Sequence, residues 1–211
     1  MNFNEQNVYK TNTKNRWILL SIISIGTLSA TLDGSSTTVI FPAVAKAFRI
    51  DVSTVLWITV AYWVTGVGLM LSMGWIGDVA GRRRVFITGS AIFVIGILLS
   101  ALSQNIEQLI TFRVLQGIGS AMLLASLNAL IAANFPNSER GKAMGLSGAV
   151  AGLGLTIGPL MGGYLLDILD WRAVFYARVP LGITGLVLAW WSLPQDRIEG
   201  TQFDLDYVGI A

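Results

Sequence analysis

A carboxylate lies inside the first long apolar stretch of the chain, and two polar residues lie at a comparable depth in the fourth. Asp33 is about 12 Å from the outer end of its stretch at helical rise, and Arg113 is about 9 Å from the same side. Gln116 follows three residues later on the same helical face as Arg113. Because an ionised carboxylate is costly to hold in lipid, such a group can take up and release protons. The three residues therefore predict proton exchange and contact with a solute.

Two other interpretations of Asp33 stay open at the level of sequence. Asp33 and Arg113 can form a purely structural ion pair, or Asp33 can cap a local break at Gly34-Ser35-Ser36. The functional interpretation is favoured because ionisable residues within membrane spans commonly mark substrate or proton pathways. For Gln116, orienting the guanidinium and contacting a solute are both compatible with an amide.

A glycine-rich and arginine-rich segment, Gly74–Arg84, connects the second and third apolar stretches. Gly74 and Gly81 permit a tight turn, and Asp78 can cap a helix or pair with Arg82 or Arg83. The row of arginines is either a topological anchor or one side of a breakable cytoplasmic latch. The residues favour neither interpretation.

The fifth stretch carries small residues at intervals of four. Such a face lets another helix pack closely, and a proline within it weakens the helical hydrogen bonds. Ordinary helix packing and a face that seals or bends during a transport cycle both fit this pattern. Gly154, Gly158 and Gly162 have this spacing, with Pro159 and Gly163 beside them.

Six apolar stretches of roughly 19–25 residues must position these side chains, and each is long enough for a helix to cross the bilayer. The chain of 211 residues is 54% hydrophobic and 12% charged, which is too few charges to cover the surface of a soluble domain. We therefore predict an all-α membrane protein with a six-helix bundle. The stretches are about 17–41, 55–73, 85–103, 109–133, 143–166 and 173–193.

The composition also excludes several kinds of chemistry. The chain contains no cysteine and no histidine, so disulfides, thiolate catalysis, histidine metal sites and histidine-based triads are excluded. Neither a nucleotide fingerprint nor a phosphate-binding loop is present. With a net charge of +2, a nucleic-acid partner is not expected. We expect neither an enzyme nor a metal or cofactor.

The basic residues predict the topology. Nine Lys and Arg residues lie on the side of the N-terminus and only three, Lys46, Arg49 and Arg172, lie on the other. The positive-inside rule places the N-terminus in the cytoplasm. We expect a cytoplasmic tail at 1–16, the bundle at 17–193, and a linker with the start of a truncated seventh span at 194–211.

Five segments together resemble the major facilitator superfamily, and within it the fourteen-span drug:proton antiporters (EmrB/QacA type). The similarity covers the first-helix Asp motif, the loop motif, the fourth-helix R-x-x-Q-G-x-G motif, the fifth-helix antiporter motif, and the W-R-x-x-F stretch that opens the sixth helix. These segments are 32–42, 74–84, 113–119, 154–163 and 171–180.

The resemblance implies two nested three-helix repeats, with the first and fourth spans lining a central cavity in the cell membrane. It implies export of amphipathic, often cationic drugs, with the proton gradient as the energy source. A protonation role falls to Asp33, a coupling role to Arg113, a gating role to Asp78 and the Gly81–Arg83 turn, and a sealing role to the Gly158-Pro159 face. The implied partners are drug-like solutes, protons, membrane lipids and the missing C-terminal half.

Two departures from the family pattern stand out. Val79 occupies a position that is usually arginine, and Arg178 one that is usually asparagine. Arg178 can reach outward to water, pair with Asp167 or Asp170, or compete with Arg113 for Asp33. Two alternatives to drug export remain. One is transport of a metabolite, lipid or peptide, and the other is a half-transporter that is inactive without its C-terminal half.

Overall fold

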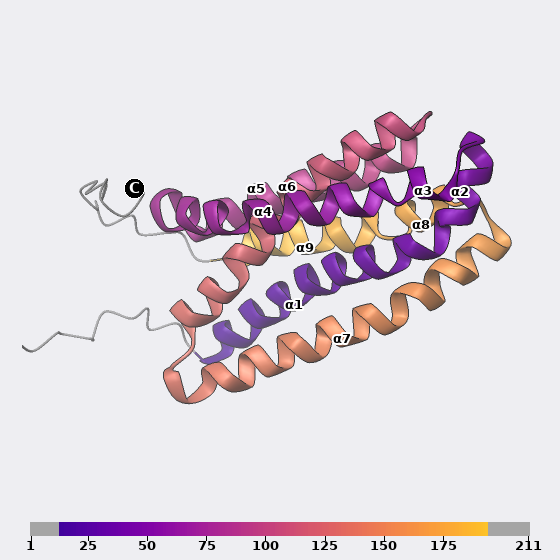
Figure 1. Ribbon diagram of the computed structural model, residues 1–211. Coiled ribbons are helices and arrows are strands. Elements are labelled where there is room, and N and C mark those ends of the chain that lie inside the picture. The colour runs from indigo at the N-terminus through magenta and orange to yellow at the C-terminus, as the bar shows by residue number, and fades with distance from the viewer. Residues whose placement is uncertain (1–12, 194–211) are drawn as a thin grey trace, which may run out of the picture.

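The computed structural model describes residues 13–193, and within that range the chain is a bundle of helices (Figure 1). The expected linker and seventh span at 194–211 lie outside the described residues, as does most of the N-terminal tail. The helices are α1 (Thr13–Ser36), the 3-10 turn η1 (Thr37–Ile40), α2 (Phe41–Phe48), α3 (Val52–Val55), α4 (Trp57–Ala80), α5 (Arg82–Leu102), α6 (Ile106–Asn134), α7 (Asn137–Ile168), α8 (Arg172–Tyr176) and α9 (Val179–Ser192).

Taken together, these elements form six continuous segments within the described residues that are long and apolar enough to cross a membrane, which confirms the predicted six-helix architecture. They are Arg16–Phe48, Val52–Ala80, Arg82–Leu102, Ile106–Asn134, Asn137–Ile168 and Arg172–Ser192.

The first span does not end at Phe41-Pro42, where the apolar stretch was expected to stop. The chain passes through η1 and continues as α2, because Pro42 lies in the first turn of α2, where its missing N–H costs no hydrogen bond. The span ends only at Phe48, followed by Arg49 in the left-handed conformation at φ 55°.

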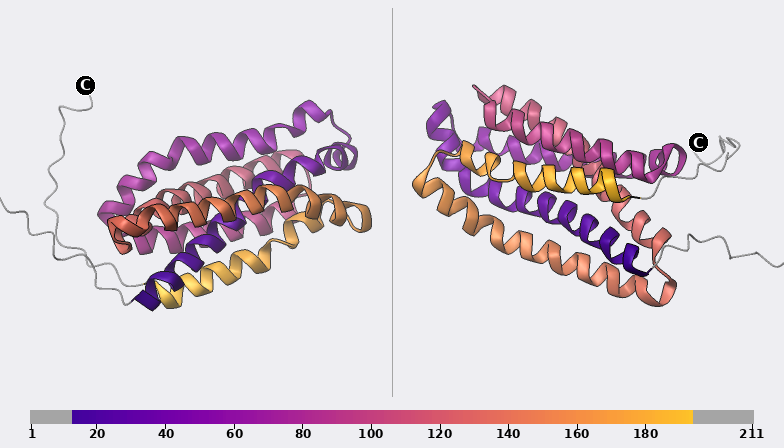
Figure 2. Two further views of the ribbon diagram at one scale, coloured as in Figure 1. Left: turned by 90° about the horizontal axis from the view of Figure 1, so that it is seen from below. Right: turned by 180° about the vertical axis from the view of Figure 1, so that it is seen from behind.

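The helices pair in a pattern that repeats within the chain. The fourth span, α6, packs against α4 and α5, and the first span, α1, packs against α7 and α9 in the corresponding way. The third and sixth spans, α5 and α9, pack against each other. The contacts of span four with spans two and three therefore correspond to the contacts of span one with spans five and six, as two three-helix repeats would produce. The start of α1 and the end of α9 lie at the same end of the bundle (Figure 2).

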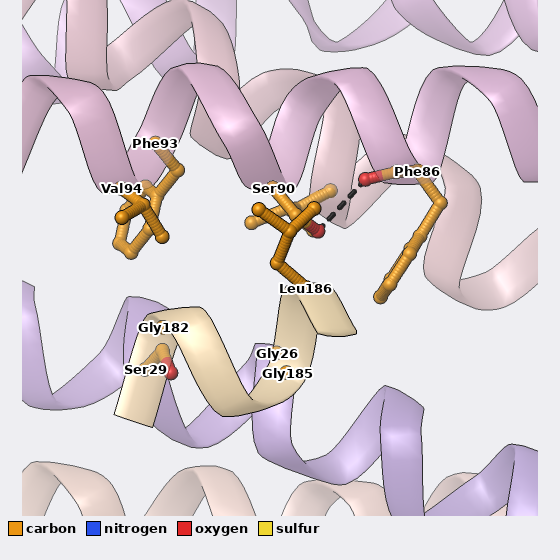
Figure 3. A pocket seen from close by; sticks show the side chains of 10 residues that line it. Gly26, Ser29, Phe86, Ser90, Phe93, Val94, Gly182, Gly185 and Leu186 are labelled. Carbon is orange, nitrogen blue, oxygen red and sulfur yellow. Dashed lines mark hydrogen bonds between the residues drawn. The ribbon is translucent and has the colours of Figure 1, made fainter. Parts of the chain in front are cut away.

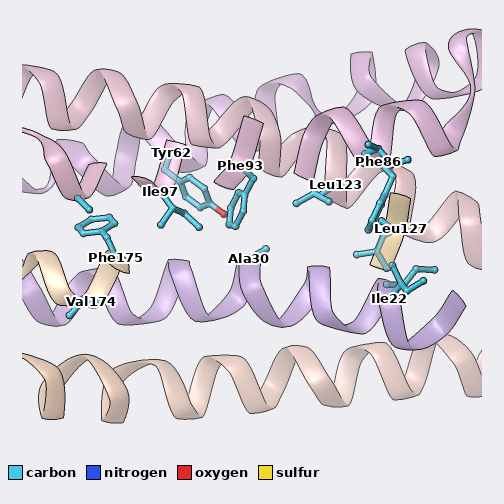
Figure 4. Close-up of a cluster of buried hydrophobic side chains, with 14 of the residues drawn as sticks. Ile22, Ala30, Tyr62, Phe86, Phe93, Ile97, Leu123, Leu127, Val174 and Phe175 are labelled. Carbon is cyan, nitrogen blue, oxygen red and sulfur yellow. The ribbon is translucent and has the colours of Figure 1, made fainter. Parts of the chain in front are cut away.

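The apolar core lies between α1, α5, α6 and α8, with large side chains such as Phe86, Phe93 and Phe175 fully buried (Figure 4). The outer helices α4 and α7 are different. They leave apolar side chains such as Leu71 and Leu160 exposed, at 88% and 70% of their surface. In a membrane such faces contact lipid or another helix.

Candidate functional site

Asp33 lies on α1 near the end of this helix, and its side chain is fully buried. Beyond Asp33 the helix runs to Ser36 and passes into η1, and the hydroxyl groups of Ser35, Ser36 and Thr37 donate hydrogen bonds to carbonyl oxygens one turn earlier. The carboxylate binds Arg113 on α6 and Arg178 between α8 and α9. Asp33 therefore does not act as the cap of a break at Gly34-Ser35-Ser36, which was one of the open interpretations.

The two oxygens of the Asp33 carboxylate accept hydrogen bonds from two different arginines. Nη1 of Arg113, on α6, donates to Oδ2 at 2.7 Å, and Nη1 of Arg178 donates to Oδ1. All three side chains are at most 1% exposed. The structure thus brings together Asp33 and Arg113, and adds a second cation at the junction of α8 and α9.

Gln116 lies beside Arg113, as the helical spacing predicts. Its Oε1 accepts a hydrogen bond from Arg113 Nη1 at 2.7 Å, and Arg113 Nε donates to the carbonyl of Ile58 at 3.1 Å. The Arg113 guanidinium also lies over the ring of Tyr62, 4.3 Å from its centroid. Gln116 therefore orients the guanidinium in this conformation.

Arg178 neither reaches water nor pairs with Asp167 or Asp170. Its Nε donates to the Val174 carbonyl at 2.8 Å, its guanidinium lies over Phe175, and Nη1 binds Asp33. Of the three outcomes considered from the sequence, the structure therefore has the one in which Arg178 shares Asp33. The two arginines bind at the same time because each takes a different oxygen.

The glycines of α7 pack against the segment of α1 that carries Asp33. A methyl group at Gly154 or Gly158 would overlap the hydroxyl of Thr31 or Ser35, and one at Gly162 would lie 3.1 Å from the Ser36 carbonyl oxygen. The Ser35 hydroxyl also donates to the Gly154 carbonyl at 3.1 Å.

Not every residue of the fifth-helix motif belongs to this contact. Gly163 faces open space, because no atom of the described residues lies within 4 Å of the position that an added methyl group would take, and Pro159 is exposed. The close-packing face is therefore formed by Gly154, Gly158 and Gly162, which share one side of the helix.

A groove of about 260 Å³ opens between α1, α4, α6 and α7. Polar groups from Thr27, Asn128 and Ser147 line it beside the flexible side chains of Met70 and Met144. Mixed polar and soft apolar lining suits an amphipathic ligand, since thioether side chains adapt to irregular shapes.

A second cavity lies between α1, α5 and α9, and it is too small for a solute. Its volume is about 10 Å³, and Gly26 of α1 and Gly182 and Gly185 of α9 lie opposite Phe86 and Phe93 of α5 (Figure 3). This is close to the volume that a single water molecule requires. The cavity is a packing gap between helices.

The loop motif is mostly helical, contrary to the expected connection over Gly74–Arg84. Gly74 and Asp78 belong to the last turns of α4, α5 begins at Arg82, and only Gly81 lies between them, at φ 102°. A glycine within a helix, such as Gly74, makes the helix less stable but does not end it. The positive φ of Gly81 favours glycine at that position. Asp78 pairs with Arg82 at 2.9 Å.

Arg83 holds α5 to the end of α9. Its Nε donates to the Leu193 carbonyl at 2.9 Å and its Nη2 to the Trp190 carbonyl at 2.7 Å. A cation at the C-terminus of a helix satisfies carbonyl groups that have no partner within the helix. The basic cluster therefore has a structural function in addition to any role in topology.

These contacts predict different effects for two neighbouring substitutions. Arg83→Ala should lower the free energy of unfolding by about 2–3 kcal/mol, because charged hydrogen bonds are lost. Asp78→Asn should lower it by less than about 1 kcal/mol, since exposed ion pairs contribute little. Thermal unfolding in detergent, followed by tryptophan fluorescence, measures both. Equal losses of unfolding free energy in the two variants would contradict the structural role of Arg83. Loss of transport in a stable Asp78→Asn protein would favour a cytoplasmic latch that includes Asp78.

The motifs, the six spans and the buried cluster can be compared with known proteins. The sequence profile described as Major Facilitator Superfamily matches residues 23–204. The chain belongs to this superfamily. It is a multi-pass membrane protein, as the six membrane-length helices indicate.

Curated relatives of this superfamily chain are transporters and resistance proteins. Riboflavin transporter RibZ of Clostridioides difficile is 36% identical over 93% of the chain and 43% of its own length. Multidrug transporter protein MdtP of Bacillus subtilis is 32% identical, covering 92% and 36%. Puromycin resistance protein pur8 of Streptomyces alboniger is 36% identical, covering 92% and 39%. The chain thus spans less than half the length of these relatives.

Sequence reasoning did not include three residues that the structure places at the cluster. Tyr62 lies under Arg113 and donates from its hydroxyl to Ser120 at 3.0 Å, and Trp63 packs over Gly34. A tyrosine hydroxyl within an apolar span was the available signal, because a buried hydroxyl needs a partner.

Proposed function

We propose that this chain is the N-terminal half of a proton-coupled exporter of amphipathic small molecules, of the fourteen-span drug:proton antiporter type. The observation that carries the proposal is the buried Asp33 carboxylate, held between arginines of two other spans. The names of the relatives MdtP and pur8 support export of drugs.

The geometry suggests how a proton acts on the bundle. Protonation of Asp33 removes its negative charge and weakens its attraction to both Arg113 and Arg178. These contacts join α1 to α6 and to the junction of α8 and α9. When both ion pairs are lost, α1 can move along the close-packing face of α7. The proton gradient supplies the energy in this scheme, with no cofactor.

We further propose a location in the cell membrane with a cytoplasmic N-terminus, as the lysine and arginine distribution predicts. The exposed apolar faces of α4 and α7 would contact lipid and the C-terminal half, which would form the other wall of the cavity. On this view the six-helix half is inactive without its partner half.

A second candidate is transport of another solute by the same fold. The relative RibZ is named as a riboflavin transporter and matches 93% of the chain. Transport of a planar, heterocyclic metabolite therefore has a specific observation in its favour.

Proton-driven flux distinguishes these candidates. In everted vesicles containing the complete transporter, we expect an imposed proton gradient to drive uptake of amphipathic dyes, ethidium among them. Collapse of the gradient with a protonophore should stop uptake. Riboflavin should neither be taken up nor compete. If riboflavin is bound and no dye is taken up, the second candidate is favoured. Dye uptake that continues unchanged in the presence of the protonophore would contradict proton coupling.

A further inference from the structure

Three nitrogen atoms at the buried cluster have no hydrogen-bond partner among the described residues. They are Nη2 of Arg113, Nη2 of Arg178 and Nε2 of Gln116. Each is an NH₂ group that can only donate. Buried donors in native proteins are nearly always paired. The site therefore has capacity for an acceptor that the described residues do not provide.

The unpaired donors belong to the two arginines that bind Asp33 and to the glutamine beside Arg113. Each belongs to the same planar group as an atom already engaged: both Nη1 atoms bind Asp33, and Gln116 Oε1 accepts from Arg113. The donors thus project from three side chains whose other ends are fixed in position. A pre-oriented set of this kind favours a ligand with several acceptor atoms.

The cluster also has more positive than negative charge. Asp33 is the one carboxylate that forms an ion pair with either guanidinium in the described part of the chain. The rings of Tyr62 and Phe175 lie against the guanidinium groups and stabilise cations. They provide no formal negative charge. One positive charge therefore remains without a counter-charge.

We propose that these donors bind a carboxylate of the transported solute, so that the transporter prefers amphipathic molecules that carry a carboxylate to those that lack one. This inference rests on the proposed transport function and defines its substrate class. Guanidinium groups bind carboxylates through paired hydrogen bonds, a geometry that lysine does not reproduce. Because the cluster is closed to solvent in this conformation, binding requires the bundle to open.

Arg178 determines this preference. Without it, Asp33 and Arg113 balance each other in charge, and a solute carboxylate would meet no excess of positive charge. Arg178→Asn removes the positive charge and leaves a neutral, polar amide in its place. Arg178→Lys keeps the charge but loses the planar fork.

A pair of dyes tests the proposal. Rhodamine 6G is a cationic ester, and its free acid differs only by carrying a carboxylate. We expect the purified protein in detergent to bind the acid about tenfold more tightly, as a charged hydrogen bond would provide. Arg178→Asn should abolish the preference and Arg178→Lys should reduce it. Arg172→Asn, which removes a partly exposed arginine outside the cluster, is the matched control.

Fluorescence anisotropy of the dyes measures binding, and stabilisation of the wild-type protein by the acid gives a second readout that needs no variant. Tighter binding of the ester, or an unchanged preference in Arg178→Asn, would overturn the proposal. Gradient-driven uptake of both dyes without preference would reject the carboxylate site and leave proton-coupled export standing. Preferential binding of the acid without gradient-driven uptake would do the reverse.

Discussion

Asp33→Asn should abolish proton-driven transport while leaving the groove between α1, α4, α6 and α7 in place. An amide cannot exchange a proton, so a gradient would have no group on which to act at this position. The substitution also leaves two buried guanidinium groups without a carboxylate, and we expect a loss of about 3–5 kcal/mol in unfolding free energy. Dye uptake into vesicles under an imposed proton gradient, compared with exchange without a gradient, measures the effect.

A loss of folding must be separated from a loss of coupling. The double variant Asp33→Asn with Arg178→Asn restores the wild-type excess of one positive charge in the cluster, so we expect it to be more stable than the single variant. It should remain uncoupled, because no carboxylate is present. Proton-driven uptake by either protein, at the rate of the wild type, would eliminate the proposed role of Asp33.

Gly158→Val should separate α1 from α7 and lower the stability of the bundle. The added Cβ would overlap the Ser35 hydroxyl and lie 3.1 Å from the Ser36 backbone nitrogen, an atom that cannot move without the helix. Overpacking of this kind costs typically about 1–3 kcal/mol, and more where backbone must shift. Because Ser35 and Ser36 follow Asp33, the displacement should also disturb its ion pairs and reduce transport.

Gly163→Val is the control for this prediction, since it places the same side chain on the same helix. Among the described residues, no atom lies within 4 Å of the position that its Cβ would take. We expect its melting temperature to stay near that of the wild type in detergent, whereas Gly158→Val melts several degrees lower. Similar melting temperatures for the two variants would mean that the α1–α7 contact is looser than the structure indicates.

The six-helix bundle could be predicted because a segment that crosses lipid must be long and apolar. A span needs about 20 apolar residues, and short connections collect the charges. The ends of the spans were less predictable. Pro42 starts a helix instead of ending one, and Gly74 and Asp78 continue α4, because glycine and proline have effects that depend on their position in a helix.

The candidate site could likewise be predicted only in part. The depth of Asp33 and Arg113 along their spans suggested that they could meet, and the spacing from Arg113 to Gln116 placed the amide beside the guanidinium. The sequence did not distinguish three partners for Arg178. Its pairing with Asp33 depends on the break between α8 and α9 and on how the sixth span packs against the first.

By itself, the sequence determined that the chain spans the membrane with six helices and which polar side chains lie within them, because the cost of transfer into lipid is a property of each segment alone. Only the tertiary structure decided which of those side chains meet. The charge balance around Asp33 and the packing of the Gly158 face against α1 depend on the rotation of each helix about its axis. That rotation results from packing between residues far apart in the chain.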